Sequence, residues 1–129
     1  GEGSILTVTS MSVKEPVNQL LLSNVFRSGV TSLVKSLANE LATENIRVNN
    51  LMPGRINTDR VQSLDKNIAE KTGQTTDAVK KQNEAKIPVG RYGTVDEFGK
   101  AGAFLLSPAA SYITGVSLAV DGGILKTVW

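Results

Sequence analysis

The stretch VNQLLLSNVFRSGVTSLVKSLANELATE, residues 17–44, predicts one long helix around which the rest of the chain is organised. Apolar side chains recur in it at steps of three and four: Leu20, Leu21, Leu22, Val25, Phe26, Val30, Leu33, Val34, Leu37 and Leu41. They exceed what one buried stripe requires, so we expect the helix to be covered on more than one side. Pro16 suits the first turn of a helix, and Asn45 can take the left-handed conformation that ends one.

Two polar side chains, Ser23 and Arg27, interrupt this apolar surface. They stand four residues apart, so one helical turn brings the hydroxyl and the guanidinium onto the same face. They are the first candidate functional residues of the chain.

Short apolar segments flank the helix, Ile5 to Thr9 before it and Ile46 to Met52 after it. The first is typical of a strand that is covered on both faces of a parallel sheet, and the second is another candidate strand. Strand, helix and strand form a right-handed crossover, which makes the strands parallel and brings their carboxyl ends to one edge. Ser10 and Pro53-Gly54 should therefore meet at that edge, where open α/β sheets bind ligands.

The groups at that edge have two interpretations. Gly54 lets the backbone approach a ligand, and Ile56-Asn57-Thr58 offers amides and a hydroxyl that face the same way. Alternatively, Pro53-Gly54 is an ordinary turn, and the Ser10 hydroxyl bonds only to local backbone, which the spacing alone favours.

The segment from Asp59 to Arg91 is polar, and Gly73 with Thr75-Thr76-Asp77 divides it into two weak helices. This segment is either a lid over a substrate or a solvated excursion.

A further helix follows Thr94, which caps it, with Asp96 and Glu97 in its first turn. Gly99 and Gly102 permit close packing against a neighbour. The expected apolar side of this helix comprises Phe98, Ala101, Phe104 and Leu105.

The chain closes with a third strand from Gly115 to Val120, which ends at Asp121-Gly122-Gly123, and an apolar tail from Leu125 to Trp129. We expect the tail to be tucked against this subunit or a partner. The whole is expected to be α/β, the C-terminal part of a doubly wound, Rossmann-like parallel sheet with about three strands and flanking helices.

Composition excludes several classes of function. The net charge is +2, and the fourteen Lys and Arg are scattered among twelve acids, which argues against nucleic acid as a partner. Without cysteine or histidine there is no thiol nucleophile, no disulfide, no common zinc site and no Ser-His pair, so we expect no metal. Neither a signal peptide nor a membrane-spanning segment is recognisable, and we expect a cytoplasmic protein.

In sequence the chain resembles the C-terminal half of the short-chain dehydrogenase/reductases, a family of NAD(P)-dependent oxidoreductases that includes the 3-oxoacyl-acyl-carrier-protein reductases. ILTVTS, residues 5–10, is similar to the family's strand before its catalytic serine. VNNLMPGRINT, residues 48–58, is similar to its cofactor-side segment, and SYITGVSLAVDGG, residues 111–123, to its last strand. The resemblance implies NAD or NADP as cofactor, and a substrate-binding region in residues 59–91.

The family's catalytic serine precedes a tyrosine by thirteen residues, and a lysine follows that tyrosine by four. Thirteen residues also separate Ser10 from Ser23, so the resemblance implies that Ser10, Ser23 and Arg27 occupy the catalytic positions. Ser23 then replaces the tyrosine, and Arg27 replaces the lysine. The cofactor-binding residues that the resemblance implies are Arg27, Pro53, Gly54, Ile56 and Thr58.

These two replacements leave two functions open. The family's phenol, with an ordinary pKa of about 10, serves as general acid or base, whereas an aliphatic hydroxyl is a poor proton donor. Arg27 keeps a positive charge and can still bind ribose hydroxyls. The chain is therefore either part of an oxidoreductase for a carbonyl or alcohol substrate, acyl-carrier-protein thioesters included, or part of a catalytically impaired relative that binds cofactor or acts as a scaffold.

The family's phosphate-binding first half has no counterpart here, since the motif GxxxGxG does not occur in the sequence. We therefore expect residues 1–129 to be a fragment, the C-terminal half of a dinucleotide-binding oxidoreductase domain, and to be inactive alone. The strand edge and helix flank that this leaves bare favour a homo-oligomer. The other expected partner is a small-molecule or acyl carrier substrate. We expect no interaction with a membrane.

Overall fold

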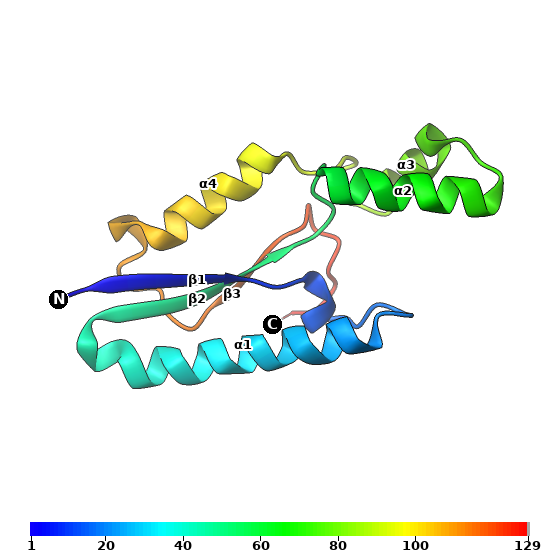
Figure 1. Cartoon of the computed structure of the whole chain (residues 1–129). Coiled ribbons are helices and arrows are strands. Elements are labelled where there is room, and N and C mark those ends of the chain that lie inside the picture. The colour runs from blue at the N-terminus through cyan, green and yellow to red at the C-terminus, as the bar shows by residue number, and fades with distance from the viewer. Residues whose placement is uncertain (129) are drawn as a thin grey trace.

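The computed structural model describes residues 1–128, which contain one three-stranded parallel sheet with helices on both faces (Figure 1). The strands are β1 (Gly3–Val8), β2 (Ile46–Pro53) and β3 (Ser117–Val120), and β2 lies in the middle. Val8 is paired with Leu51, and Pro53 with Val120, so all three strands end at the same edge. The predicted crossover and the predicted Rossmann-like α/β class are confirmed.

Two layers of helix enclose the sheet, and a helical pair extends beyond its carboxyl edge (Figure 1). Helix α1 (Leu21–Leu41) packs on one face and α4 (Val95–Leu106) on the other. The pair comprises α2 (Asp59–Thr72) and α3 (Thr76–Ala85). Short 3₁₀ helices are η1 (Met11–Val13), η2 (Ala42–Glu44) and η3 (Pro108–Ala110).

The long helical stretch ends at Asn45 as predicted, with η2 continuing from the end of α1 at Leu41, but it begins later than predicted. Asn45 adopts φ 58° after η2, so the left-handed end is confirmed. The predicted start in the first turn after Pro16 is wrong, because the helix begins at Leu21. Gln19, at φ 67°, takes a left-handed conformation that a right-handed helix cannot continue through. The Leu20 N–H donates instead to the Val17 carbonyl at 3.3 Å.

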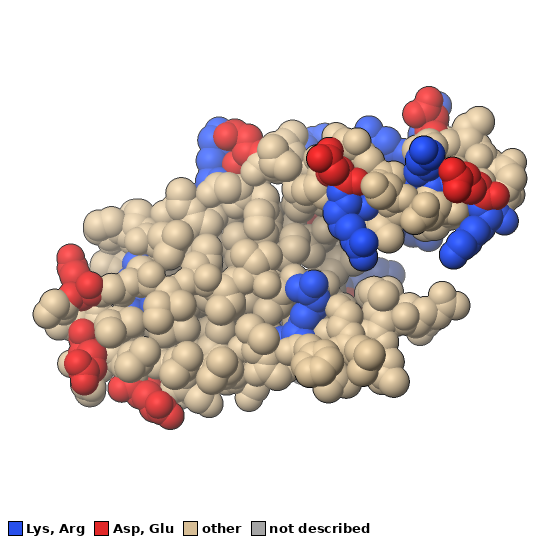
Figure 2. Space-filling view, in the orientation of Figure 1, with Lys and Arg blue, Asp and Glu red and all other residues tan. Residues whose placement is uncertain are grey.

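Only one side of α1 is covered within residues 1–128, contrary to expectation. Val34 and Ala38 are buried against Val48, whereas Leu21 and Phe26 are 74% and 69% exposed. Strand β1 is likewise not covered on both faces, since Ile5 and Val8 are exposed at the sheet edge; Figure 2 shows the broad surface over β1 and α1 as largely uncharged. The sequence pattern therefore correctly marks apolar faces, but these residues do not bury them all.

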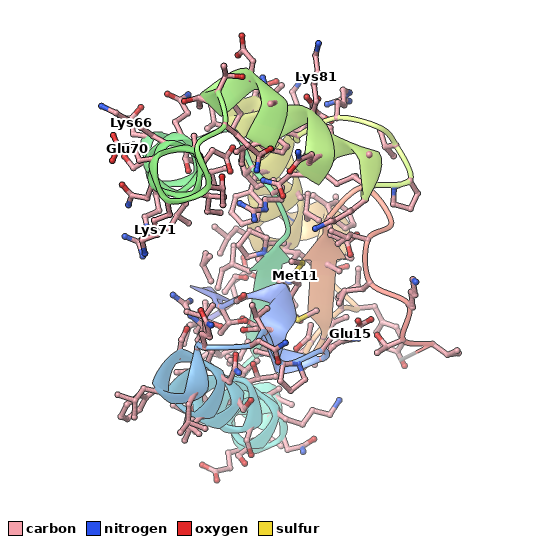
Figure 3. All side chains as sticks on the ribbon, turned by 90° about the vertical axis from the view of Figure 1, so that its right-hand side faces the viewer. Met11, Glu15, Lys66, Glu70, Lys71 and Lys81 are labelled. Carbon is pink, nitrogen blue, oxygen red and sulfur yellow. The ribbon has the colours of Figure 1, made fainter. Side chains whose placement is uncertain are left out.

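The division of residues 59–91 into two helices is confirmed. Gly73, at φ 67°, ends α2, and the Thr75 hydroxyl accepts from the Ala78 N–H at 3.1 Å to begin α3. In Figure 3, Lys66 and Lys71 project from α2 and Lys81 from α3, and all three are exposed. These lysines form a solvated surface.

Helix α4 starts with the cap that the sequence predicts. The Thr94 hydroxyl accepts from the Glu97 N–H, and the Glu97 carboxylate accepts from the Thr94 N–H, each at 3.1 Å. Arg91 donates two further hydrogen bonds to Glu97, at 2.8 and 3.1 Å. These bonds from Arg91, with those from Thr94, lower the pKa of Glu97 to about 2, and Glu97 in turn raises the pKa of Arg91.

The packing around α4 confirms the close approach expected at Gly102 but not the one expected at Gly99. A Cβ at Gly102 would lie 3.4 Å from Leu6 Cδ2, so close packing occurs there, but nothing lies within 4 Å of such an atom at Gly99. Leu105 is buried, whereas Phe104 is exposed and does not belong to the packed side. The predicted third strand begins two residues late, because Gly115 adopts φ 74°.

No helix in the described residues is long and apolar enough to cross a membrane.

The Glu15 carboxylate, which Figure 3 shows near the C-terminal segment, accepts from the Lys126 N–H at 2.7 Å. Val128 is exposed rather than tucked in, and Trp129 lies outside the described residues.

Candidate functional site

Ser10 follows β1 at the carboxyl edge of the sheet and caps η1. Its hydroxyl accepts from the Ser12 N–H at 3.2 Å, which is the bond to local backbone that the sequence left open as one of two alternatives for Ser10. Within residues 1–128 no hydrogen bond joins Ser10 to Ser23 or to Arg27. The structure thus brings Ser10 to the predicted edge without linking it directly to the other two residues.

Ser23 and Arg27 do lie on one face of α1, as predicted. Arg27 Nε donates to Ser23 Oγ at 3.0 Å, and Arg27 Nη1 donates to the Thr9 carbonyl at 2.9 Å. The guanidinium therefore ties the first half of α1 to the end of β1, one residue before Ser10. The Thr9 contact is one that the sequence did not indicate.

Gly54 follows β2, and the close approach predicted for it is made by Asp121. A Cβ at this position would lie 2.7 Å from both Cα and Cβ of Asp121, closer than carbon atoms pack. The Gly54 N–H also donates to the Val120 carbonyl at 2.9 Å. The glycine is therefore required by the packing of the ends of β2 and β3, whatever else it serves.

The segment after Gly54 uses most of its polar groups internally. The Asn57 N–H donates to the Gly93 carbonyl at 2.8 Å, and the Thr58 N–H to the Ile56 carbonyl at 2.7 Å. The Thr58 hydroxyl accepts from the Val61 N–H at 3.3 Å and so caps α2. Of the three amides expected to face a ligand, that of Ile56 alone has no hydrogen-bond partner in the described part of the chain.

A buried polar network at the centre of the sheet escaped the sequence interpretation. Its centre is Asn50 on β2, which is fully buried and bonds to hydroxyls from both neighbouring strands and from α1. The partners are Thr7, Thr9, Thr31 and Ser117. The available signal was a second asparagine in the predicted strand Ile46 to Met52, since a buried amide needs hydrogen-bond partners.

A second missed cluster attaches the helical pair to the rest of the fold. Asp65 of α2 is buried, and its carboxyl group accepts from the Tyr92 hydroxyl at 2.6 Å and from Asn83 Nδ2 of α3 at 3.0 Å. Arg55 Nη1 lies 3.5 Å from the same carboxyl group. Burial, with the hydrogen bond to Asp65, raises the pKa of Tyr92. Tyr92 thus has a structural role.

Replacing Tyr92 by phenylalanine tests that attachment. Tyr92→Phe removes the 2.6 Å hydrogen bond and leaves a buried carboxyl group with one donor fewer, so we expect a loss of about 1–3 kcal/mol in the free energy of unfolding. Tyr112→Phe is the matched control, because Tyr112 is fully exposed, and it should change stability by less than about 0.5 kcal/mol. Urea unfolding measures both; equal stabilities of the two variants would contradict the assignment.

A parallel sheet with helices on both faces, and with polar groups at its carboxyl edge, defines the Rossmann-like class of α/β proteins. Residues 1–125 match the protein family described as enoyl-(acyl carrier protein) reductase. The chain therefore belongs to the short-chain dehydrogenase/reductase family.

Known relatives span a longer sequence than this chain. The NADPH-dependent reductase BacG of Bacillus subtilis (strain 168) is 32% identical over 126 residues, which cover 98% of this chain and 49% of BacG. The 3-oxoacyl-acyl-carrier-protein reductase FabG of Chlamydia pneumoniae is 36% identical over 122 residues, which cover 95% of this chain and 45% of FabG. The chain thus spans about half the length of these relatives, which fits the expected fragment.

Among solved structures, the L-sorbose reductase of Gluconobacter frateurii, in complex with NADPH and L-sorbose, is similar with a TM-score of 0.92 at 29% identity. The similarity covers 99% of this chain and 49% of that protein. The sheet and helices described above are therefore the arrangement that an NADPH-bound reductase uses in one half of its fold.

Proposed function

We propose that this chain is the C-terminal half of an NAD(P)-dependent oxidoreductase domain and that it holds the ribose and nicotinamide part of the cofactor. The observation that carries the proposal is the position of Arg27, whose guanidinium spans Ser23 and the Thr9 carbonyl at the carboxyl edge of the sheet. Relatives that use NADPH, BacG and the L-sorbose reductase, support a dinucleotide at this edge.

The residues at the edge fit that part of the cofactor. Within residues 1–128, Arg27 Nη2 and the Ile56 N–H have no hydrogen-bond partner, and both are donors for hydroxyl or carbonyl oxygens. Pro53, Gly54 and Thr58 complete the proposed cofactor-binding set. The diphosphate needs another part of the protein, because no GxxxGxG loop is present in the sequence.

The bound cofactor would supply a hydride to a carbonyl carbon of the substrate, whose oxygen would take a proton from water, or it would accept a hydride from an alcohol carbon while the alcohol proton passes to water. In this proposal the Ser10 and Ser23 hydroxyls hold the substrate oxygen, and the positive charge of Arg27 favours negative charge that develops on it. The substrate class is a small carbonyl compound or alcohol. An acyl-carrier-protein thioester is included because FabG is among the relatives.

A second candidate, a relative that binds the cofactor without hydride transfer, is favoured by one contact. Ser23 Oγ accepts a hydrogen bond from Arg27, and no phenol occupies this position to act as a general acid. Fluorescence titration of the natural full-length protein with NADPH and NADH, followed by turnover on a carbonyl panel, separates the candidates. Binding with turnover supports the oxidoreductase, binding without turnover supports the second candidate, and no binding contradicts both.

Self-association is part of the proposal, and the apolar surface of α1 supports it. Leu21, Leu22 and Phe26 are at least 69% exposed and lie on consecutive turns of one helix, and an apolar patch of this kind is a usual protein interface. We expect light scattering to show a dimer or larger assembly. Leu22→Glu with Phe26→Glu should dissociate it, and a wild-type monomer at all concentrations would contradict self-association.

A further inference from the structure

Asn50 makes hydrogen bonds that cross the sheet and reach α1. Its Oδ1 accepts from the hydroxyls of Thr7 at 2.9 Å and Thr9 at 3.1 Å. The two hydrogens of its Nδ2 are shared among three hydroxyls within hydrogen-bond distance, those of Thr9 at 2.9 Å, Thr31 at 3.2 Å and Ser117 at 3.3 Å. No atom of this side chain is exposed, so the amide depends wholly on these protein partners.

Two of these contacts lead to Arg27 by separate routes. Thr9, bound to Asn50 through its hydroxyl, presents its backbone carbonyl to Arg27 Nη1 at 2.9 Å. Thr31, bound to Asn50 Nδ2, donates its hydroxyl hydrogen to the backbone carbonyl of Arg27 at 2.9 Å. One route fixes the guanidinium, and the other fixes the helix turn from which the side chain extends.

We propose that Asn50 is a positioning residue that acts on Arg27 through Thr9 and Thr31. Burying an amide in the middle strand costs free energy that burying an apolar side chain there would not cost. The hydrogen bonds that offset this cost lead to Arg27. The Arg27 side chain is long and exposed, so holding it in place before a ligand arrives lowers the entropy lost on binding. The functional part of this inference rests on the proposed role of Arg27 in cofactor binding.

The test follows the side-chain Nη–Hη signals of Arg27 by NMR, which include the group bonded to the Thr9 carbonyl and are assigned from their loss in Arg27→Lys. Asn50→Ala removes the centre of the network, and the double variant Thr9→Val with Thr31→Val removes both routes while Asn50 stays in place. Thr31→Ser keeps the hydroxyl and is the conservative variant. Thr43→Val is the matched control, because Thr43 is exposed and makes no side-chain hydrogen bond in the described residues.

We expect exchange of the Arg27 Hη protons with water to accelerate about tenfold or more in the double variant and in Asn50→Ala, the factor that about 1.4 kcal/mol of lost restraint gives. Thr31→Ser and Thr43→Val should keep the wild-type signal. The Arg47 signal, which belongs to a separate set of contacts, should not change and reports that the fold is intact. Wild-type exchange of Arg27 in a folded double variant would overturn the inference.

Cofactor binding is measured on the same variants and tests whether the position of Arg27 matters for affinity. We expect affinity for NADPH or NADH to fall about tenfold in the double variant and to be wild-type in Thr31→Ser. If the wild-type protein binds neither nucleotide, the proposed function fails, whereas the Arg27 exchange rates still decide whether Asn50 positions that side chain.

Discussion

Gly54→Ala is expected to lower the free energy of unfolding by about 2–3 kcal/mol, as an overpacked core position does. The added Cβ would lie 2.7 Å from Asp121 Cα, a main-chain atom, so the ends of β2 and β3 must move apart rather than a side chain rotating away. Urea unfolding with an unchanged slope measures this loss directly.

Gly99→Ala is the matched control for this substitution. No atom lies within 4 Å of the added Cβ, and alanine favours the helix over glycine, so the variant should be more stable than wild type by about 0.5–1 kcal/mol. The two substitutions are chemically identical, and opposite signs are expected from packing alone. A Gly54→Ala protein as stable as wild type would show that β2 and β3 do not meet as described.

Ser23→Tyr combined with Arg27→Lys is expected to raise carbonyl reduction by about 100-fold or more in the natural full-length protein, provided that the cofactor binds. The pair restores the phenol and the lysine that the family resemblance implies for these positions. A phenol beside a cation is a competent proton donor, which the Ser23 hydroxyl is not.

Three variants control for this gain. Each single substitution should recover less than the pair, because Arg27→Lys supplies no phenol, and Ser23→Tyr keeps a planar guanidinium whose reach differs from that of a lysine ammonium. Ser36→Tyr, at an exposed position of the same helix, should leave the rate unchanged. Equal rates in wild type and the double variant, with cofactor bound, would contradict the assignment of these positions to the reaction.

Local signals in the sequence were enough to place most ends of the helices. Asn45, Gly73, Thr75 and Thr94 act through their own backbone conformation or a hydroxyl three residues from its partner, and the structure has each in its predicted role. The start of α1 depends on the left-handed conformation of Gln19, for which glutamine gives no signal.

Burial was predicted less well, because periodicity identifies an apolar face without identifying what covers it. The exposed face of α1 carries the same spacing of Leu, Val and Phe as a buried face, and the side packed on β2 is the one that Val34 and Ala38 occupy. A sequence that spans about half of its relatives can carry apolar faces that match residues outside it.

The candidate site shows the same division between local and distant contacts. The pairing of Ser23 with Arg27 follows from helical spacing, so it was predictable. The bond from Arg27 to Thr9 involves a backbone carbonyl eighteen residues away, and Asn50 bonds to a residue 67 positions away. Such contacts depend on strand register, which residue types alone do not set.

The role of Arg27 in cofactor binding is tested most directly by the affinity for NADPH and NADH of the natural full-length protein carrying Arg27→Met, beside Lys100→Met as control. Each variant removes one positive charge, but Lys100 lies on α4, across the sheet from α1, and pairs with Asp96. We expect Arg27→Met to weaken binding about tenfold or more and Lys100→Met to leave the affinity unchanged. Equal affinity in wild type and Arg27→Met would contradict the role of Arg27 in cofactor binding.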